Sequence, residues 1–463
     1  MAKKAKENKP DDAITTYDPG FNKVVDDICR GKYILLLGSD IILNKQLNPE
    51  ANGDSTKLFL EESYSEFREK EHRDKHPVHS FQELICNNKL ETVAVKHFLT
   101  KKIIPDIEFQ PEELSEDLIR LLKTRCFRLV LTMTFDSSVE TLMNEVWGKD
   151  KYRIKNISAD ENCDLSETDI LGDEYFDIPP TLYYMFGKAE PNLPEVEFAL
   201  DDNDYISFIS KWLTSPPEKL LSYLETKKIL VLGCNLKDWA FRFLWFALRR
   251  DKKDPNNFKN LTNGDIAVLL QANTSEQDKN LINYLINTLH IRVQTDSRDY
   301  VKKLADALEV EKIAGNINAM ANTGGVFISY ATEDFAIAYR LFDMLKKANI
   351  PVWLDNSKLS VGDGYDNRIE DAIRQCRIFI PLLTSTVAED LIADKPRYYR
   401  DEWKLASGVN DQITCFPIVT SNYDYRQEYH KKVPAVIQKV SVFDWTMDPI
   451  ILLINKIKQT LNS

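Results

Sequence analysis

Residues 326–334 read V-F-I-S-Y-A-T-E-D, an apolar run that ends in Ser-Tyr and passes into a polar turn able to cap a helix. Further apolar runs follow it: I-P-V-W-L-D at 350–355, R-I-F-I-P-L-L-T-S at 377–385 and C-F-P-I-V-T at 415–420. Amphipathic stretches at 334–348 and 367–375 lie between them, and R-Y-Y-R-D-E-W-K-L-A begins or continues another helix. This alternation predicts a doubly wound parallel sheet, with Trp353 in its core. Ligands of such sheets bind beyond the carboxyl ends of the strands, where Ser329, Asp355 and Thr384 fall.

The same alternation precedes this region. Apolar strands are predicted at Tyr33–Leu37, Arg128–Thr132, Thr181–Phe186, Lys228–Gly233 and Asp265–Gln271, with helical stretches between them. The charged stretch 148–178 has little periodicity and is predicted to be an insertion or a flexible loop. The fold class is therefore α/β with two doubly wound parallel-sheet domains. We expect a disordered tail at 1–20, a first domain at 21–313, a linker at 314–323 and a second domain at 324–463.

Composition excludes several classes of protein. The 463 residues carry a formal net charge of −12, which disfavours generic binding to nucleic acid. No apolar run reaches the roughly 18 residues of a membrane span. None of the seven cysteines forms a C-x-x-C pair, so we expect no metal site and a reducing, cytoplasmic location. His72, His76 and His79 surround Pro77, which interrupts a helix, and are predicted to lie in a solvated segment.

The C-terminal 140 residues resemble the TIR domain family. The resemblance rests on F-I-S-Y-x-x-x-D, the W-L-D strand and the G-D-G loop, and it implies a flavodoxin-like fold. Catalytic members of the family hydrolyse or cyclise NAD⁺ with a glutamate on the helix after the third strand, a position that matches Glu402. The resemblance places substrate-stacking aromatics at Tyr398, one helical turn earlier, and at Tyr365, after the glycine loop.

The remaining substrate contacts are predicted at the ends of strands. They comprise Ser329, Tyr330 and Ala331, whose backbone amides could hold phosphate, and Asp355. The chemistry that the resemblance implies needs one fixed carboxylate, because the nicotinamide of NAD⁺ is already a cationic leaving group. A carboxylate beside the ribose stabilises the positive charge of the oxocarbenium-like transition state. On residues alone, Glu402 could equally be an ordinary surface glutamate, and the tyrosines could be core or rim aromatics.

The first domain resembles the sirtuin-like fold, a Rossmann-type sheet that binds NAD. Its better signals are T-M-T-F-D at 132–136 and the D-W that follows L-G-C-N-L-K. The degenerate site predicted here comprises Gly38, Asp40, Thr134, Asp136 and Phe186. Asp40 replaces a glycine that lets backbone approach pyrophosphate, Thr134 replaces an asparagine, and Phe186 replaces the histidine base. We expect a scaffold that has lost catalysis. Four roles stay open for this domain: it assembles the protein, senses a trigger, binds a nucleotide weakly without turnover, or is a structural domain that binds no ligand.

A sirtuin-like domain followed by a TIR domain resembles bacterial anti-phage defence proteins. The main hypothesis is an NAD⁺ nucleosidase that uses NAD⁺ as its substrate and needs no cofactor. It would be activated by self-association, with the loop 356–365 closing a neighbour's site, and would respond to a phage-derived trigger or a partner subunit. Two alternatives remain: a non-catalytic signalling scaffold, and a synthase of a cyclic ADP-ribose signal.

Overall fold

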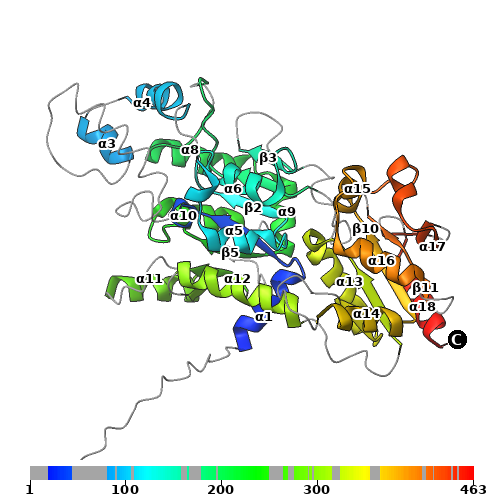
Figure 1. Cartoon of the computed structure of the whole chain (residues 1–463). Helices are drawn as coiled ribbons and strands as arrows, with labels where there is room; N and C mark the ends of the chain where they lie inside the picture. Colours follow the sequence, from blue (N-terminus) through cyan, green and yellow to red (C-terminus); the bar gives the residue numbers. More distant parts are fainter. Residues whose placement is uncertain are drawn as a thin grey trace, which may run out of the picture.

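Two parallel α/β sheets organise the chain, which confirms the predicted fold class (Figure 1). The structure is a computed structural model. It describes residues 19–43, 81–88, 91–105, 109–157, 164–165, 179–193, 197–249, 264–268, 276–289, 291–294, 297–314, 324–354, 365–408, 413–420, 422–438, 442–445 and 448–462. The predicted tail up to residue 18, the predicted linker after Ala314 and the three histidines at 72–79 lie outside these residues.

The N-terminal sheet has its strands in the order β3-β4-β2-β1-β5-β6-β7, and every pairing is parallel. The strands are β1 Tyr33–Leu37, β2 Leu129–Thr132, β3 Arg153–Asn156, β4 Thr181–Tyr184, β5 Lys228–Leu232, β6 Ile266–Val268 and β7 Arg292–Gln294. Because the order reverses at β1, successive crossovers place helices on both faces, as in other doubly wound sheets.

Two helical layers cover the N-terminal sheet. The first comprises α1 Pro19–Cys29, α5 Glu116–Lys123, α6 Ser138–Trp147 and α12 Ser297–Ala314. The second comprises α8 Asp202–Thr214, α9 Glu218–Thr226, α10 Trp239–Arg249 and α11 Glu276–Asn287. The short elements around them are η1 Ser39–Ile41, α3 Phe81–Asn88, α4 Thr92–Phe98, η2 Leu99–Ile103 and η3 Pro111–Glu113.

Strand β1 explains why both layers are needed. All five of its residues are buried. Tyr33, Leu35 and Leu37 face the first layer, whereas Ile34 and Leu36 face the second. A strand covered on both faces needs a continuous apolar run, which the sequence Y-I-L-L-L supplies.

The C-terminal sheet has the order β13-β12-β10-β8-β9, with β11 also paired to β10. Its strands are β8 Val326–Ser329, β9 Val352–Leu354, β10 Ile378–Leu383, β11 Thr414–Cys415, β12 Ile418–Val419 and β13 Phe443–Asp444. Its helices are η4 Thr332–Asp334, α13 Phe335–Lys347, α14 Tyr365–Gln375, α15 Ser385–Ile392, α16 Tyr398–Gly408, η5 Glu428–Lys432, α17 Ala435–Gln438 and α18 Ile450–Asn462. Helices α13 and α18 cover one face, and α14, α15 and α16 cover the other.

Two expectations were wrong in detail. Part of the stretch 148–178, predicted to lack regular structure, forms β3. The predicted single strand at 415–420 is two short strands, β11 and β12, separated by Phe416 and Pro417. Proline has no N–H for the ladder, so it interrupts the strand. Trp353 lies in β9 and is partly buried against the core, as predicted.

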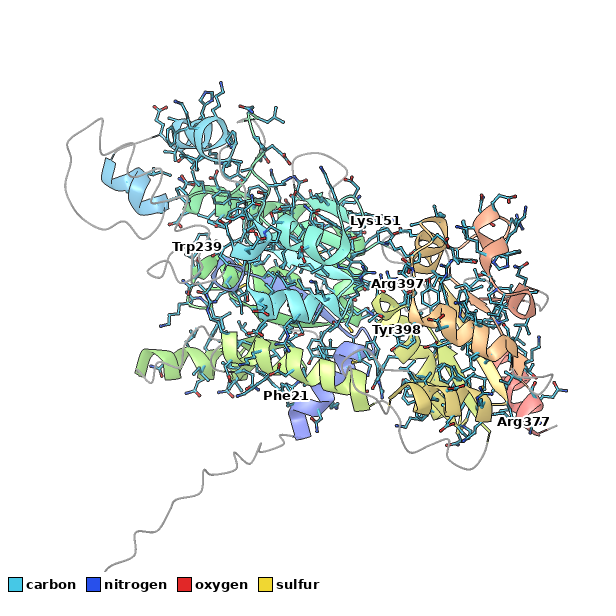
Figure 2. All side chains as sticks on the ribbon, in the orientation of Figure 1. Phe21, Lys151, Trp239, Arg377, Arg397 and Tyr398 are labelled. Carbon is cyan, nitrogen blue, oxygen red and sulfur yellow. The ribbon has the colours of Figure 1, made fainter. Side chains whose placement is uncertain are left out.

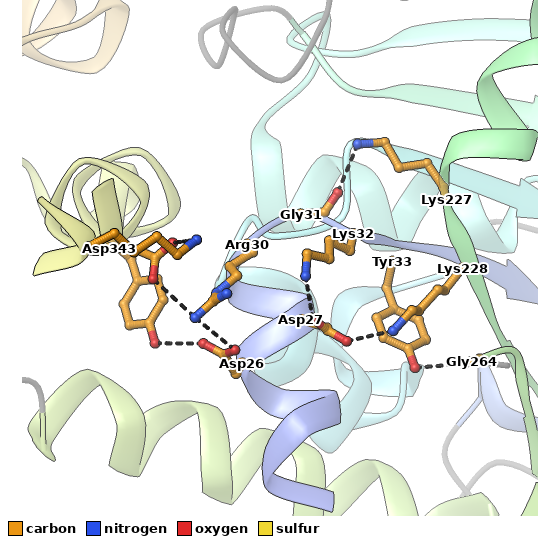
Figure 3. A network of polar contacts seen from close by, with 12 residues as sticks. Asp26, Asp27, Arg30, Gly31, Lys32, Tyr33, Lys227, Lys228, Gly264 and Asp343 are labelled. Atoms are coloured by element: carbon orange, nitrogen blue, oxygen red, sulfur yellow. Dashed lines mark hydrogen bonds and ion pairs between the residues drawn. The ribbon is translucent and has the colours of Figure 1, made fainter. Parts of the chain in front are cut away.

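Helices α1 and α13 join the two domains, and one apolar cluster continues from the first layer of the N-terminal domain into α13. Arg30, which follows α1, forms ion pairs of 3.0 Å with Asp26 and with Asp343 of α13 (Figure 3). Tyr339 of α13 donates a hydrogen bond of 3.3 Å to Asp26. The contact therefore combines apolar packing with a small charged network.

Among the residues that the structure describes, no helix is both long enough and apolar enough to cross a membrane.

Candidate active site

Glu402 lies on α16 and is almost completely buried, with 7% of its surface exposed. Its carboxylate Oε2 accepts a hydrogen bond of 2.5 Å from the Ser329 hydroxyl. Ser329 is the last residue of β8 and has no exposed surface. The carboxylate is therefore held at the carboxyl edge of the C-terminal sheet, which is where open α/β sheets bind ligands.

A small pocket opens beside this carboxylate. Its volume is about 180 Å³. Drug-sized ligands occupy pockets of roughly 300–1,000 Å³, so this one accommodates part of a dinucleotide rather than all of it. Helices α14 and α16 form its walls, with the following lining residues: Ile369, Glu370, Ile373, Tyr398, Asp401, Glu402 and Leu405.

Tyr398 begins α16 and lines the same pocket as Glu402. Its side chain is 65% exposed, whereas the next tyrosine, Tyr399, is buried against Trp403 with ring centroids 4.9 Å apart. Helix α16 thus anchors its buried face through Tyr399 and Trp403 and leaves Tyr398 available at the mouth of the pocket. An exposed aromatic face beside a carboxylate can stack on a flat cationic ring.

The other predicted substrate contacts have different surroundings. Tyr330 is partly buried, and its ring centroid lies 6.4 Å from that of Phe335. Ala331 is buried and precedes η4. Neither residue is among those that line the pocket of Glu402. Asp355 lies outside the described residues, as do residues 356–364, and Tyr365 begins α14 without its side chain being described.

Asp334 connects two loops at this edge, a role that the sequence did not suggest. Its carboxylate accepts hydrogen bonds from Thr384, at 2.6 Å, and from Thr386, at 2.9 Å. Thr384 also caps α15, because its hydroxyl accepts from the Val387 amide at 3.2 Å. The aspartate of F-I-S-Y-x-x-x-D therefore ties the loop after β8 to the loop after β10.

Arg397, directly before Tyr398, is a second feature that sequence reasoning missed. It forms ion pairs with Glu333 at 3.0 Å and with the buried Asp390 at 2.8 Å. Burial alone would lower the pKa of Arg397, but the hydrogen bond that it donates to Asp390 and the charge of Glu333 raise it, so the guanidinium stays cationic. The only sign of this role in the sequence is that an arginine directly precedes Tyr398, the aromatic residue that begins α16.

In the N-terminal domain, the carboxyl ends of β1 and β5 lie against each other. The Gly38 amide donates to the Leu232 carbonyl at 2.9 Å, and the Asp40 amide donates to Gly233 at 3.3 Å. A Cβ on Gly38 would lie 2.2 Å from the Gly233 carbonyl oxygen. The Asp40 carbonyl accepts from Arg298 at 3.1 Å. The backbone here is therefore occupied by contacts within the protein.

The remaining residues of the predicted degenerate site are also engaged. Asp136, two residues before α6, accepts a hydrogen bond of 2.9 Å from the Ser138 amide. The Thr134 hydroxyl lies 2.9 Å from that of Thr132. Phe186 is buried, and its ring centroid lies 4.9 Å from that of Tyr205 in an edge-on contact. Phenylalanine offers no proton acceptor at the position where the resemblance would place a base.

In the described part of the chain, no group of three or more His, Cys, Asp or Glu side chains is arranged to hold a metal ion. Cys234, beside Gly38, is buried, and burial raises the pKa of its thiol well above the ordinary value of 9.0. A thiol in that state is a poor nucleophile and a poor metal ligand.

Comparison with known families agrees with the geometry. Residues 326–450 match the family model described as TIR domain, and residues 128–293 match the one described as SIR2-like domain. A search of curated proteins found no match.

Proposed function

Because the chain carries a SIR2-like domain followed by a TIR domain, we propose that its TIR domain cleaves NAD⁺ to nicotinamide and ADP-ribose and that Glu402 is the catalytic residue. The SIR2-like domain serves as a non-catalytic partner in this scheme. Self-association activates the enzyme, and its role is to deplete NAD⁺ during phage infection.

The buried Glu402–Ser329 pair is the observation that carries this proposal. A surface glutamate would be solvated and mobile, but this carboxylate is held by a hydroxyl at the carboxyl edge of the sheet. A fixed negative charge requires little reorganisation when positive charge develops on the ribose, so it stabilises the transition state more than the ground state. Nicotinamide leaves as a neutral molecule, so no strong general acid is needed.

Tyr398 supports the same assignment. It stands at the mouth of the pocket, where its exposed ring can stack on the nicotinamide. The pocket of about 180 Å³ accommodates only part of NAD⁺. We propose that a neighbouring TIR domain completes the site, with its residues 356–365 covering the rest of the substrate.

Incubation of the purified protein with NAD⁺ tests the proposal. The wild type should release nicotinamide, and Glu402→Gln should lower the rate by at least about 10²-fold, the scale of a lost transition-state contact. Glu428→Gln is the matched control, because Glu428 is exposed and pairs only with Lys431 among the described ion pairs. Equal rates for wild type and Glu402→Gln would refute the assignment and leave a signalling scaffold.

Four further measurements separate the remaining parts of the proposal. Specific activity should rise with protein concentration if assembly completes the site. Chromatography should show free ADP-ribose, whereas a cyclic product would identify a synthase. Glu402→Gln protein should show no deacylation, because that activity would come from the SIR2-like domain. Cells that express the wild type, but not Glu402→Gln, should lose NAD⁺ and restrict phage growth.

A further inference from the structure

A cavity of about 580 Å³ lies between the two domains, apart from the pocket of Glu402. Its size is within the roughly 300–1,000 Å³ typical of small-molecule sites. Its N-terminal wall includes Arg125, Arg128 and Lys151, which precede strands β2 and β3. Its C-terminal wall includes Thr386 and Asn422, which follow β10 and β12. The amino edge of the SIR2-like sheet thus faces the carboxyl edge of the TIR sheet.

The N-terminal wall presents two guanidinium groups. Arg125 and Arg128 lie over the ring of Trp147, at 4.7 Å and 5.4 Å from its centroid. Arg125 also donates a long hydrogen bond of 3.5 Å to the Val146 carbonyl. An aromatic ring restrains a guanidinium through a cation–π contact, and the planar donors of a guanidinium match the geometry of a phosphate.

Three carboxylates of the C-terminal wall are paired with cations. Asp390 and Glu333 are bound by Arg397, and Glu389 pairs with Lys151 across the domain boundary. Asp334 accepts hydrogen bonds from two threonines, which occupy its oxygens but leave its charge in place. Figure 2 shows Lys151 and Arg397 at this boundary, on opposite sides of it. The three paired acids therefore position cations at the cavity.

Helix α15 adds a further positive element. Its first residues, Ser385 and Thr386, line the cavity. The amino end of an eight-residue helix carries a partial positive charge and favours anions. Positive groups thus approach the cavity from both domains.

We propose that this interdomain cavity binds a nucleoside phosphate. Arg125 and Arg128 hold its phosphates, and the guanidinium planes together with Tyr429 contact its base. Because the ligand touches both domains, it stabilises their docked arrangement relative to a separated one. Occupancy of the cavity consequently couples the SIR2-like domain to the TIR domain. The binding itself does not depend on the proposed NAD⁺ cleavage, and the two can fail separately.

Calorimetric titration of the full-length protein with ADP tests the site, with adenosine and inorganic pyrophosphate as companion probes. ADP should bind most tightly, pyrophosphate more weakly, and adenosine not detectably. The double variant Arg125→Gln/Arg128→Gln should bind ADP at least about tenfold more weakly, since losing even one charge-assisted hydrogen bond costs about that factor. Arg125→Lys/Arg128→Lys keeps the charge without the planar fork and should fall between.

Two controls locate the binding. Arg120→Gln removes an arginine of α5 that pairs with Asp117 and Asp306 outside the cavity, and it should leave ADP affinity within about twofold. Tyr398→Ala alters the pocket of Glu402 and should also leave it unchanged.

Photolabelling of the wild type with azido-ADP gives a readout that needs no variant. The label should appear in peptides that contain Trp147 or Tyr429. Label at Tyr398 would overturn the proposal, as would adenosine binding as tight as that of ADP. Unchanged ADP affinity in the double glutamine variant, or no ADP binding up to about 1 mM, would also overturn it.

Discussion

The serine at the end of β8 orients the glutamate of α16, although 73 residues separate them in the chain. Ser329 was predicted to contact substrate, which stays a prediction, and the structure shows that its hydroxyl donates to Glu402. A hydrogen bond to a carboxylate restricts its rotation and directs its other oxygen, so the serine acts as a positioning residue.

Replacing Ser329 by Ala should lower kcat of NAD⁺ cleavage by about 10–100-fold, because a hydrogen bond to a charged group contributes about 1.5–3 kcal/mol. KM should change little, since the serine acts on the transition state through Glu402. Ser329→Thr restores the hydroxyl and should recover part of kcat. A change in KM alone would assign Ser329 to substrate binding.

Asp27 makes stability depend on pH. Its carboxylate accepts from Lys32 at 2.8 Å and Lys228 at 2.6 Å (Figure 3). Burial alone would raise the pKa of Asp27, but these two lysines lower it below the ordinary 3.8. A carboxyl with a lowered folded pKa contributes stability above the unfolded pKa and loses it as the pH falls through the folded value.

The difference in unfolding free energy between the wild type and Asp27→Asn should therefore be largest between about pH 5 and 7 and shrink towards pH 3. Urea titrations at several pH values measure it. A difference that stays constant down to pH 3 would show that the lysines do not favour the ionised carboxyl.

At the scale of elements, the junction of β1 and β5 has no room for a side chain. Gly38→Ala should destabilise the N-terminal domain by about 1–3 kcal/mol, because the new Cβ would meet backbone that cannot move aside. Gly408→Ala, at the end of α16, is the matched control, since nothing lies within 4 Å of its added Cβ. Thermal unfolding followed by circular dichroism should show a lower midpoint for the first variant only.

In the N-terminal sheet, the central strands could be predicted from the sequence, and the edge strands could not. Strand β1 has the predicted bounds, because a short run of five apolar residues, all of them buried, is typical of a central strand. Strands β3 and β7, at the two edges of the sheet, were missed because R-I-K-N and R-V-Q are charged and partly exposed. Edge strands carry polar residues to avoid pairing with other chains, so they lack the apolar signal.

In the candidate site, the arrangement within one helix could be predicted, but the contacts between distant segments could not. Helix spacing predicted that Tyr398 and Glu402 share a face. The hydrogen bond between Ser329 and Glu402 and the bonds from Thr384 and Thr386 to Asp334 link residues 50 or more positions apart. Such contacts depend on how loops meet at a sheet edge, and local patterns carry no information about them.

At the scale of the whole molecule, the ion pair between Arg30 and Asp343 should contribute little to the free energy of domain association. A double-mutant cycle on Arg30→Ala and Asp343→Ala should give a coupling of about 0.5–1 kcal/mol at low salt and less at high salt, because both side chains remain partly solvated. The exposed pair Lys431–Glu428 should give no measurable coupling. A coupling of several kcal/mol that resists salt would indicate permanently joined domains.

The SIR2-like domain meets its neighbour with the amino edge of its sheet, so the opposite rim, near Gly38 and Phe186, points outward. Trp239, which lies on that side, is far from the domain boundary in Figure 2. A ligand bound to the outward rim would not cover Glu402. Any effect of that ligand on the C-terminal domain would have to be transmitted through strands about 17 Å long. The parallel sheet of the N-terminal domain thus separates its outward rim from the candidate site of the C-terminal domain. A substitution on that rim leaves the surroundings of Glu402 unchanged.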